Sequence, residues 1–294
     1  MKTLLKIVIS VIIIAMLSLT VFATEQPAVC IKYSAGETRF DFYRLADFSE
    51  KKGASLTETF SQYKKTIPLL KDINKLNAEQ SRILASTMEA VIIRDQIQPI
   101  YSEKSDSNGV LSMVGLKTGI YLVIGHTSND GKYVYIPSPL IVSIPDYDVD
   151  GKLQYDVTII HNKVEKRPVD SSPIKYKVVK VWKDLGAEKK RPREINVSLF
   201  KDGIYQETII LNKENNWTYE WTELDSGVYY TAIEESVPQN YTMTLEKERT
   251  CFYIKNSYDN PEPPDLPATG QLWWPVPLCI VVGIVSLAFG LKKR

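Results

Sequence analysis

The chain is predicted to be mostly β, with two tandem antiparallel β-sandwich domains between an N-terminal signal peptide and a C-terminal transmembrane helix. Three observations predict this. Short runs of β-branched and aromatic residues alternate with turn dipeptides such as Asn108-Gly109 and Asp202-Gly203, a pattern typical of sandwiches. Such runs are especially dense between residues 173 and 258. An uncharged apolar run stands near each end of the chain, as export and membrane-anchoring segments require.

Residues 1–23 are predicted to be the signal peptide. Lys2 and Lys6 supply the positive n-region, and the stretch from Ile7 to Thr20 is apolar apart from small hydroxyls. Val21-Phe22-Ala23 offers small residues for cleavage, so the mature chain would begin at Thr24. A retained membrane helix is the alternative, but the chain already has an anchor at its other end.

The composition of the exported part excludes several classes of protein. About 240 residues remain between the two apolar ends, enough for one large or two ordinary domains. The formal net charge of +1 gives no indication of nucleic-acid binding. Cys30 and Cys251 lie far apart and Cys279 is in the anchor, so no disulfide framework is predicted. His126 and His161 are too isolated for a metal site, and no cofactor is expected.

The first domain is predicted to cover residues 24–166. Its strands are expected on both sides of a helical insertion at about 56–98, which we place on one edge of the sandwich. Asn77 and Gln80 have the spacing of a helix-capping box. Apolar residues then recur at helical spacing and are interpreted as core rather than as a binding groove: Ile83, Leu84, Met88, Val91 and Ile92. The predicted strands are Val29–Tyr33, Arg39–Leu45, Val110–Met113, Gly119–Gly125, Lys132–Ile136, Leu140–Ile144 and Leu153–Ile160.

Four segments of this domain resemble the N-terminal domains of pilin-like surface proteins: Phe40–Leu45, Gly115–Val123, Tyr135–Pro145 and Tyr155–Ile159. In that family the last strand often ends in a proline-lysine pair, whose lysine sortase can join to the next subunit. Here the corresponding positions are His161 and Asn162, and Lys163 follows one residue later. Lys163 is therefore the candidate linkage lysine, although the departure from the family pattern puts polymerisation through this site in doubt.

The acidic stretch from Asp146 to Gly151 invites comparison with a calcium-binding loop. An EF-hand loop also needs a bidentate glutamate at its twelfth position, which here is Val157. An acidic hairpin turn is therefore the preferred interpretation.

A polar, proline-bearing linker is predicted at Lys166–Pro173, and the second domain at 173–258. Seven short strands in this length predict a small antiparallel sandwich with Greek-key-like winding. They are Ile174–Trp182, Ile195–Phe200, Ile204–Leu211, Asn216–Trp221, Val228–Glu234, Tyr241–Leu245 and Cys251–Asn256.

The second domain resembles an Ig-like B-type domain of the Cna collagen-adhesin family. The segments that carry the resemblance are Lys180–Asp184, Arg191-Pro192, Asn216–Tyr219, Tyr230–Glu234 and Ile254–Tyr258. The stretch from Tyr230 to Tyr241 also resembles the E-box of pilins.

The resemblance implies an isopeptide bond between Lys180 and Asn256, formed with the help of Glu234. Burial would favour the neutral amine that must attack and the protonated acid that shuttles protons as ammonia leaves. The alternative is a surface lysine, a solvated acid and a turn-forming asparagine. In the first domain the analogous pair would be Lys32 and Asn162. No convincing acid partner is evident for that pair, with Asp41 the one considered, and no bond is expected there.

The chain ends in a proline-rich spacer and motif (259–270) and a transmembrane segment with a basic tail (271–294). Leu266-Pro267-Ala268-Thr269-Gly270 precedes the uncharged run Leu272–Leu291 and the final Lys292-Lys293-Arg294. That run is long enough to cross a bilayer, and the basic residues would hold its end inside. The arrangement resembles the cell-wall sorting signal of Gram-positive surface proteins. A sortase would cut after Thr269 and join its carbonyl to an amine.

These features predict a secreted, wall-anchored structural or adhesive protein, either a pilin-like subunit or a single stalked adhesin. Sortase, peptidoglycan or other pilin subunits, and host surface proteins are the expected partners, and membrane contact is expected only before sorting. No arrangement of residues for turnover catalysis is evident, and the chain is not expected to be an enzyme. A wall-anchored enzyme with a catalytic first domain is the alternative.

Overall fold

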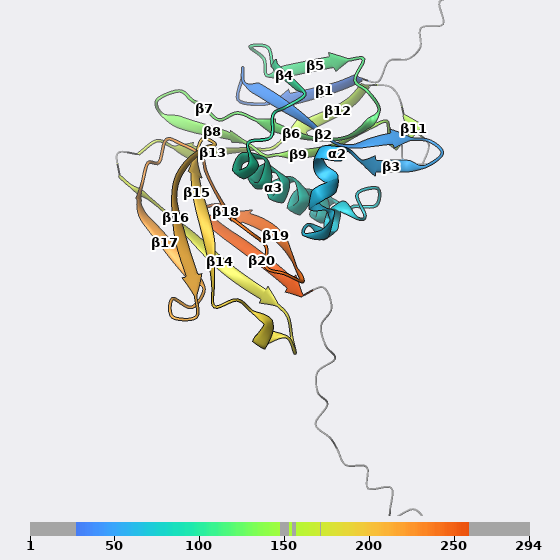
Figure 1. Ribbon diagram of the computed structural model, residues 1–294. Coiled ribbons are helices and arrows are strands. Elements are labelled where there is room, and N and C mark those ends of the chain that lie inside the picture. Colours follow the sequence, from blue (N-terminus) through green and yellow to red (C-terminus); the bar gives the residue numbers. More distant parts are fainter. Residues whose placement is uncertain (1–27, 148–152, 155–156, 171, 259–294) are drawn as a thin grey trace, which may run out of the picture.

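The computed structural model describes residues 28–147, 153–154, 157–170 and 172–258. The predicted signal peptide, spacer, sorting motif and transmembrane segment lie outside these residues. Within them the chain is mostly β, as predicted, with the described α-helices gathered in one insertion (Figure 1).

Two sheets pack face to face in the first domain. The smaller sheet has the order β12-β1-β5 and consists of β1 (Ala28–Tyr33), β5 (Val110–Val114) and β12 (Val157–Asn162). The larger has the order β3-β2-β6-β9, with β4 (Tyr101–Lys104) also paired to β2, and consists of β2 (Arg39–Ser49), β3 (Gly53–Leu56), β6 (Gly119–Gly125) and β9 (Leu140–Ile144). The first and last of these strands, β1 and β12, are parallel neighbours.

The larger sheet is buried on both faces. Because side chains alternate along a strand, Tyr121 and Val123 of β6 pack with Ile31 in the core between the two sheets. Ile120 and Leu122 point the other way, into a second core that contains the helical insertion. The strand β6 therefore lies in the middle of a three-layer arrangement.

The helical insertion begins with α2 (Glu58–Ser61) and two 3-10 turns, η1 (Gln62–Lys65) and η2 (Pro68–Leu70), and continues with α3 (Ala78–Asp95). The capping box is confirmed: the Gln80 amide donates to Asn77 Oδ1 at 2.8 Å, and the Asn77 amide donates to Gln80 Oε1 at 3.0 Å. The predicted edge position is wrong. The helix α3 packs with Ile120 and Leu122 on a face of the sheet, because their side chains project toward it.

The helix α3 also packs between the two domains. From Leu84 to Ile92 almost every residue is buried, as expected of a helix covered on opposite sides. Its contacts are with β6 and β9 of the first domain and with β18 (Tyr230–Glu234) and β19 (Tyr241–Glu248) of the second. The Leu245 amide donates to Thr87 Oγ1 at 2.9 Å, and the Met243 amide donates to the Thr66 carbonyl at 2.7 Å. A single hydrophobic core therefore spans both domains.

Part of the predicted linker is a strand. β13 (Val164–Pro168) pairs with β8 (Tyr133–Pro137), which also pairs with β7 (Ser128–Asn129). Arg167, near the end of β13, donates to the Tyr176 hydroxyl at 2.6 Å and to the Val228 carbonyl at 2.7 Å. The first domain thus extends to Pro168, and its last strand is attached to the second domain by side-chain hydrogen bonds.

The acidic stretch of the first domain begins a short hairpin. β10 (Asp146–Tyr147) pairs with β11 (Leu153–Gln154), while the acidic turn between them lies outside the described residues. Among the residues that are described, no group of three or more His, Cys, Asp or Glu side chains is arranged to hold a metal ion.

The second domain contains the seven predicted strands in two sheets. One has the order β17-β14-β20-β19, with β14 (Ile174–Lys183), β17 (Thr218–Leu224) and β20 (Cys251–Tyr258) joining β19. The other has the order β16-β15-β18, with β15 (Glu194–Lys201) and β16 (Ile204–Asn212) joining β18; a 3-10 turn, η3 (Glu188–Lys190), precedes β15. The first strand β14 and the last strand β20 are parallel neighbours, as β1 and β12 are in the first domain.

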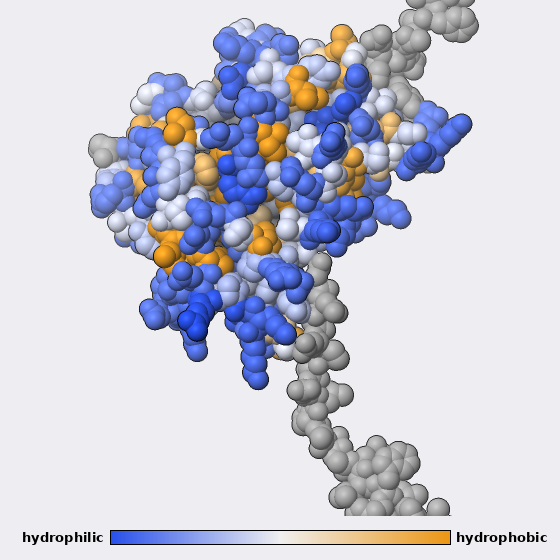
Figure 2. Space-filling model, viewed as in Figure 1, coloured by the Kyte–Doolittle hydropathy of each residue, from blue (hydrophilic) through white to orange (hydrophobic). Residues whose placement is uncertain are grey.

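The exterior is mainly hydrophilic in the view of Figure 2, with apolar residues in small separate patches. Cys30 and Cys251 are both free thiols. Among the helices of the described part, none combines the length and the apolar character needed to cross a membrane.

Candidate functional site

The three residues expected to form the isopeptide bond come from three strands of the second domain. Lys180 lies on β14 and Asn256 on the neighbouring β20, where the register pairs Lys180 with Ile254 and Trp182 with Asn256. Alternation along both strands turns Lys180 and Asn256 into the core. Glu234 ends β18 in the opposite sheet and faces them across the sandwich.

All three side chains are buried. The relative exposure is 4% for Lys180 and 0% for both Glu234 and Asn256. Charged residues are rarely buried to this degree unless they are paired. The alternative of a surface lysine, a solvated acid and a turn-forming asparagine is therefore wrong.

Glu234 bridges the other two residues. Its Oε2 lies 2.6 Å from Lys180 Nζ, and its Oε1 accepts a hydrogen bond of 3.3 Å from Asn256 Nδ2. Among the described residues, Asn256 Oδ1 is buried without a hydrogen-bond partner. An orphaned buried carbonyl oxygen costs about 1–3 kcal/mol, so the site is left with an unpaired acceptor beside an acid.

Burial brings the lysine and the glutamate toward their neutral forms. Desolvation lowers the pKa of Lys180 to about 8, although the neighbouring Glu234 opposes this. Desolvation also raises the pKa of Glu234, against the opposing effects of Lys180 and Asn256. Transfer of one proton over the 2.6 Å contact therefore converts a buried ion pair into a neutral amine and a neutral carboxylic acid.

The neutral pair has the groups needed for amide formation. The Lys180 amine could attack the Asn256 carboxamide carbon, and the protonated Glu234 could donate to Oδ1 once the carboxamide turns so that Oδ1 rather than Nδ2 faces the acid. Collapse of the tetrahedral intermediate would break the C–N bond, and the nitrogen would leave as ammonia with a proton relayed by Glu234. An uncharged amide would then replace the buried ionisable amine and remove a desolvation penalty.

Aromatic rings and a second ion pair enclose the triad. The Trp182 ring centroid lies 4.8 Å from Lys180 Nζ and packs edge-on against Tyr241. Arg191 makes two hydrogen bonds to Asp184, at 2.7 and 2.6 Å, and the Tyr241 hydroxyl adds a third at 2.9 Å. These bonds, those from Arg191 above all, hold the pKa of Asp184 below its usual value. No role was predicted for this pair, although Asp184 and Arg191 lie in the segments that carried the family resemblance.

The first domain does not assemble an equivalent site from the residues expected there. Lys32 is exposed and pairs with His161, whereas Asn162 is buried and exchanges hydrogen bonds with the Ser138 backbone. In the second domain, Lys180 lies two residues before Trp182, the register partner of Asn256. In the first domain the register partner of Asn162 is Tyr33, and the residue two positions before it is the fully buried Ile31. Lys32 is one residue out of step and lies on the wrong face of its strand.

Asp41, the acid considered for that pair, is engaged elsewhere. His126 Nε2 lies 2.6 Å from its carboxylate, Arg39 Nη2 donates to it at 3.3 Å, and Ser102 makes a further hydrogen bond. Burial acts to raise the pKa of Asp41, but the hydrogen bonds from His126 and Ser102 outweigh it and the net shift is downward. A carboxylate held ionised in this way is not suited to donate a proton.

Lys163, the candidate linkage lysine, is exposed immediately before β13. It lies at a groove of about 360 Å³ between the domains, together with Arg82 of α3 and Arg249 of the β19–β20 turn. The amine is therefore accessible from outside, as attachment to another chain requires.

A further cluster at this groove was not predicted. The Tyr229 hydroxyl donates to Glu89 Oε2 at 2.8 Å, and Lys247 Nζ lies 3.7 Å from the Tyr229 ring centroid and donates to the Tyr230 carbonyl at 3.1 Å. Glu89 is 5% exposed, and burial raises its pKa against the attraction of Lys247. The sequence did place the acidic Glu89 among the apolar residues of α3. Because charged residues usually face solvent, this position alone did not indicate a buried cluster.

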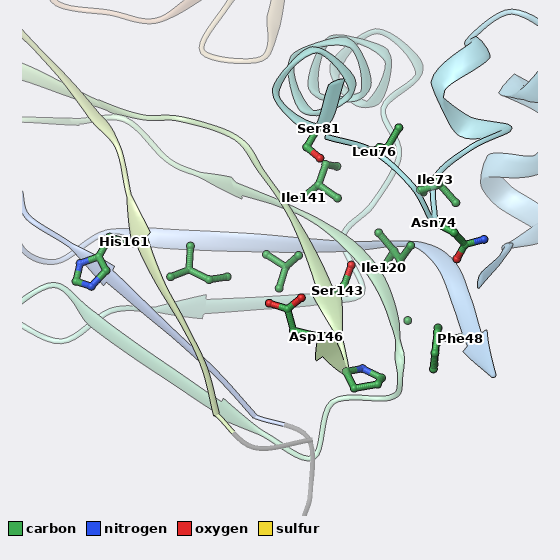
Figure 3. Close-up of a pocket in the computed structure, with 14 residues that line it drawn as sticks. Phe48, Ile73, Asn74, Leu76, Ser81, Ile120, Ile141, Ser143, Asp146 and His161 are labelled. Carbon is green, nitrogen blue, oxygen red and sulfur yellow. The ribbon is translucent and has the colours of Figure 1, made fainter. Parts of the chain in front are cut away.

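A cavity of about 520 Å³ lies between the helical insertion and β9 (Figure 3). Ser81, Ser143, Asp146 and His161 are among its lining residues and are the residue types that a hydrolase uses. Figure 3 shows His161 set well apart from Ser143 and Asp146. His161 is therefore not placed to act as a base toward Ser143 in this cavity.

Comparison with known proteins is most specific for the second domain. Residues 176–257 match the family of the Cna protein B-type domain. The collagen adhesin of Staphylococcus aureus is 33% identical over 140 residues, a match that covers 42% of this chain and 12% of that protein. The matched stretch thus spans only about an eighth of the length of this curated relative.

Two solved structures are among the structural matches. A single B repeat unit of the collagen-binding surface protein of S. aureus has 18% identity and a TM-score of 0.29, covering 80% of this chain and all of that one. The pilus backbone protein of Streptococcus pneumoniae has 13% identity and a TM-score of 0.29, covering 79% of each chain. Scores this low carry no weight for function.

Proposed function

We propose that this chain, which carries a Cna protein B-type domain over residues 176–257, is a wall-anchored structural or adhesive surface protein stabilised by a Lys180–Asn256 isopeptide bond. The supporting observation is the buried triad, in which Glu234 lies 2.6 Å from Lys180 Nζ and 3.3 Å from Asn256 Nδ2. The bond forms once in each molecule, so the reaction is a maturation step and Glu234 acts in it as acid and proton shuttle.

The intact mass of the ectodomain, residues 24–265, tests the bond. Wild-type protein is expected to be lighter than calculated by one ammonia, because the Asn256 nitrogen leaves when the amide forms. The Lys180→Ala variant is expected at its full calculated mass. Lys183→Ala is the matched control, since this exposed lysine lies on the same strand and its loss leaves the reaction intact. Wild-type protein at full mass would rule out the bond.

We further propose that sortase joins Thr269 to peptidoglycan or to another subunit. The support is the sequence order of motif, apolar run and basic tail. The exposed Lys163 is the proposed acceptor if subunits are joined to one another. Host surface proteins are a further proposed class of partner, and the short match to the collagen adhesin does not specify collagen.

Wall extracts of the producing cell test the attachment. Wild-type protein is expected to be released only when the wall is digested, and Thr269→Ala to remain in the membrane fraction because sortase no longer forms its acyl intermediate. A pilus subunit would give an SDS-resistant ladder that Lys163→Ala abolishes and the exposed-lysine control Lys132→Ala preserves. A single anchored band would identify a lone surface protein. Equal release of Thr269→Ala and wild type by wall digestion would contradict sorting at this motif.

A further inference from the structure

One residue of the first domain reaches the acid of the triad. Arg94 lies in the last turn of α3, and its Nη1 donates to the backbone carbonyl of Glu234 at 3.0 Å. Glu234 is the last residue of β18, so this carbonyl is at the point where the strand ends. The contact joins the helical insertion directly to the residue that holds Lys180 and Asn256 together.

The guanidinium is fixed from its other side by the first domain. Asp95 accepts hydrogen bonds from Arg94 Nε at 2.7 Å and from Nη2 at 2.8 Å. The Tyr63 hydroxyl donates to the same carboxylate at 2.6 Å. The Arg94 side chain is 18% exposed, whereas its partner Asp95 lies at the surface, so the guanidinium is held between an exposed carboxylate and the part-buried carbonyl of Glu234. A bidentate arginine–carboxylate pair of this kind sets the orientation of the guanidinium as well as its position.

We infer that Arg94 is a positioning residue for the Lys180–Asn256 reaction, so that bond formation in the second domain depends on docking of the first domain. The inference rests on the proposed isopeptide bond. Arg94 does not touch the reacting atoms. It holds the end of β18, and thereby sets where the Glu234 carboxyl lies relative to the amine and the carboxamide.

Arg94 also affects the protonation of the site. The charged groups that act on the Glu234 carboxyl are Lys180 from β14 and Arg94 from α3, and both favour the carboxylate form; Asn256 from β20 contributes a hydrogen bond. The reactive state of Lys180 and Glu234 carries one proton between them, so the rate should follow a bell-shaped pH profile. Removing a nearby cation favours proton binding, and both limbs of the profile should move to higher pH.

The test follows bond formation in newly made ectodomain. Wild-type, Arg94→Ala, Arg94→Lys and Arg82→Ala proteins are synthesised in a short cell-free pulse, and loss of ammonia is timed by intact mass at a series of pH values. Arg94→Ala should react on the order of ten-fold or more slowly, because small displacements of a reacting group cost rate steeply. It should also show the profile shifted to higher pH. Arg94→Lys keeps the charge and should react slowly with the limbs in place.

Arg82→Ala is the matched control, since Arg82 is an exposed arginine of the same helix. It is expected to react as wild type does. Arg94→Ala and Arg94→Lys proteins that both keep the wild-type rate would overturn the inference while leaving the proposed bond intact. Slowing of Arg82→Ala to the same degree, with no shift of the Arg94→Ala profile, would also overturn it, because a general loss of helix stability would explain both. Wild-type protein that never loses ammonia would remove the proposed bond itself.

Discussion

Replacing Lys180 by methionine is expected to lower the free energy of unfolding by about 3–5 kcal/mol. The Lys180–Asn256 amide would close a loop that contains most of the second domain. A cross-link that closes a loop of this size lowers the conformational entropy of the unfolded chain, which stabilises the folded state by a free energy in that range. Methionine fills the volume of the lysine stem, so the loss reports the missing bond rather than a cavity. The two domains share one core, so a single transition with a melting temperature lower by roughly 10 °C is expected.

Two variants separate the bond from its surroundings. Glu234→Gln keeps the shape of the acid but cannot shuttle protons, so the bond should not form. This variant should therefore have its full calculated mass and lose about as much stability as Lys180→Met. Lys183→Met changes an exposed lysine of the same strand and should stay within about 0.5 kcal/mol of wild type. Urea unfolding measured by tryptophan fluorescence gives the three values. A Lys180→Met protein as stable as Lys183→Met would show that the bond contributes nothing to stability.

Replacing Lys247 by methionine is expected to cost about 2 kcal/mol, because it leaves Glu89 buried at the domain interface without its cation. The cost should depend on pH. Loss of Lys247 raises the pKa of Glu89 in the folded state further above its value in the unfolded chain. Over the pH range between these two pKa values, the folded protein holds a proton on Glu89 that the unfolded chain does not. The penalty relative to wild type is therefore small in acid and grows as pH rises above the folded pKa of Glu89 in the wild type, which burial already raises above the usual glutamate value.

A second substitution identifies the cause. Glu89→Gln keeps an acceptor for the Tyr229 hydroxyl and removes the charge, so the double variant with Lys247→Met should recover most of the loss. Lys201→Met is the control, because its partner Asp225 is exposed and surface pairs contribute less than about 1 kcal/mol. Thermal unfolding from pH 5 to pH 8 gives the comparison. A double variant less stable than Lys247→Met alone would contradict the role assigned to the buried charge.

Local sequence patterns predicted the strands of the second domain well. Their alternation is clear because each sheet has one buried face, and turn residues such as Asp202-Gly203 separate the strands. The capping box at Asn77 was also readable, since it involves residues only three apart. Lys180, Glu234 and Asn256 were found through the family resemblance. Their periodicity could not place them together, because one residue of slip turns a side chain to the opposite face.

The errors share a physical origin. β13 was predicted as linker because Lys166, Arg167 and Pro168 are polar or turn-forming, yet an arginine that bonds across to the second domain is compatible with a strand. The apolar residues of α3 were recognised, but helical periodicity does not show which part of the protein packs against them, here strands of both domains. Glu89 was missed for the same reason: its partner Tyr229 is 140 residues away.

The parallel pairing of β14 and β20 also decides how the second domain would respond to a pull on its two ends. Ile174 and Tyr258 lie at opposite ends of the paired strands, so a pull between them shears the whole ladder at once instead of unzipping it. With the amide in place, force would pass from β14 through Lys180 directly to Asn256. The chain between these residues, roughly 250 Å when extended, could not be drawn out. The domain would then transmit tension as an inextensible link.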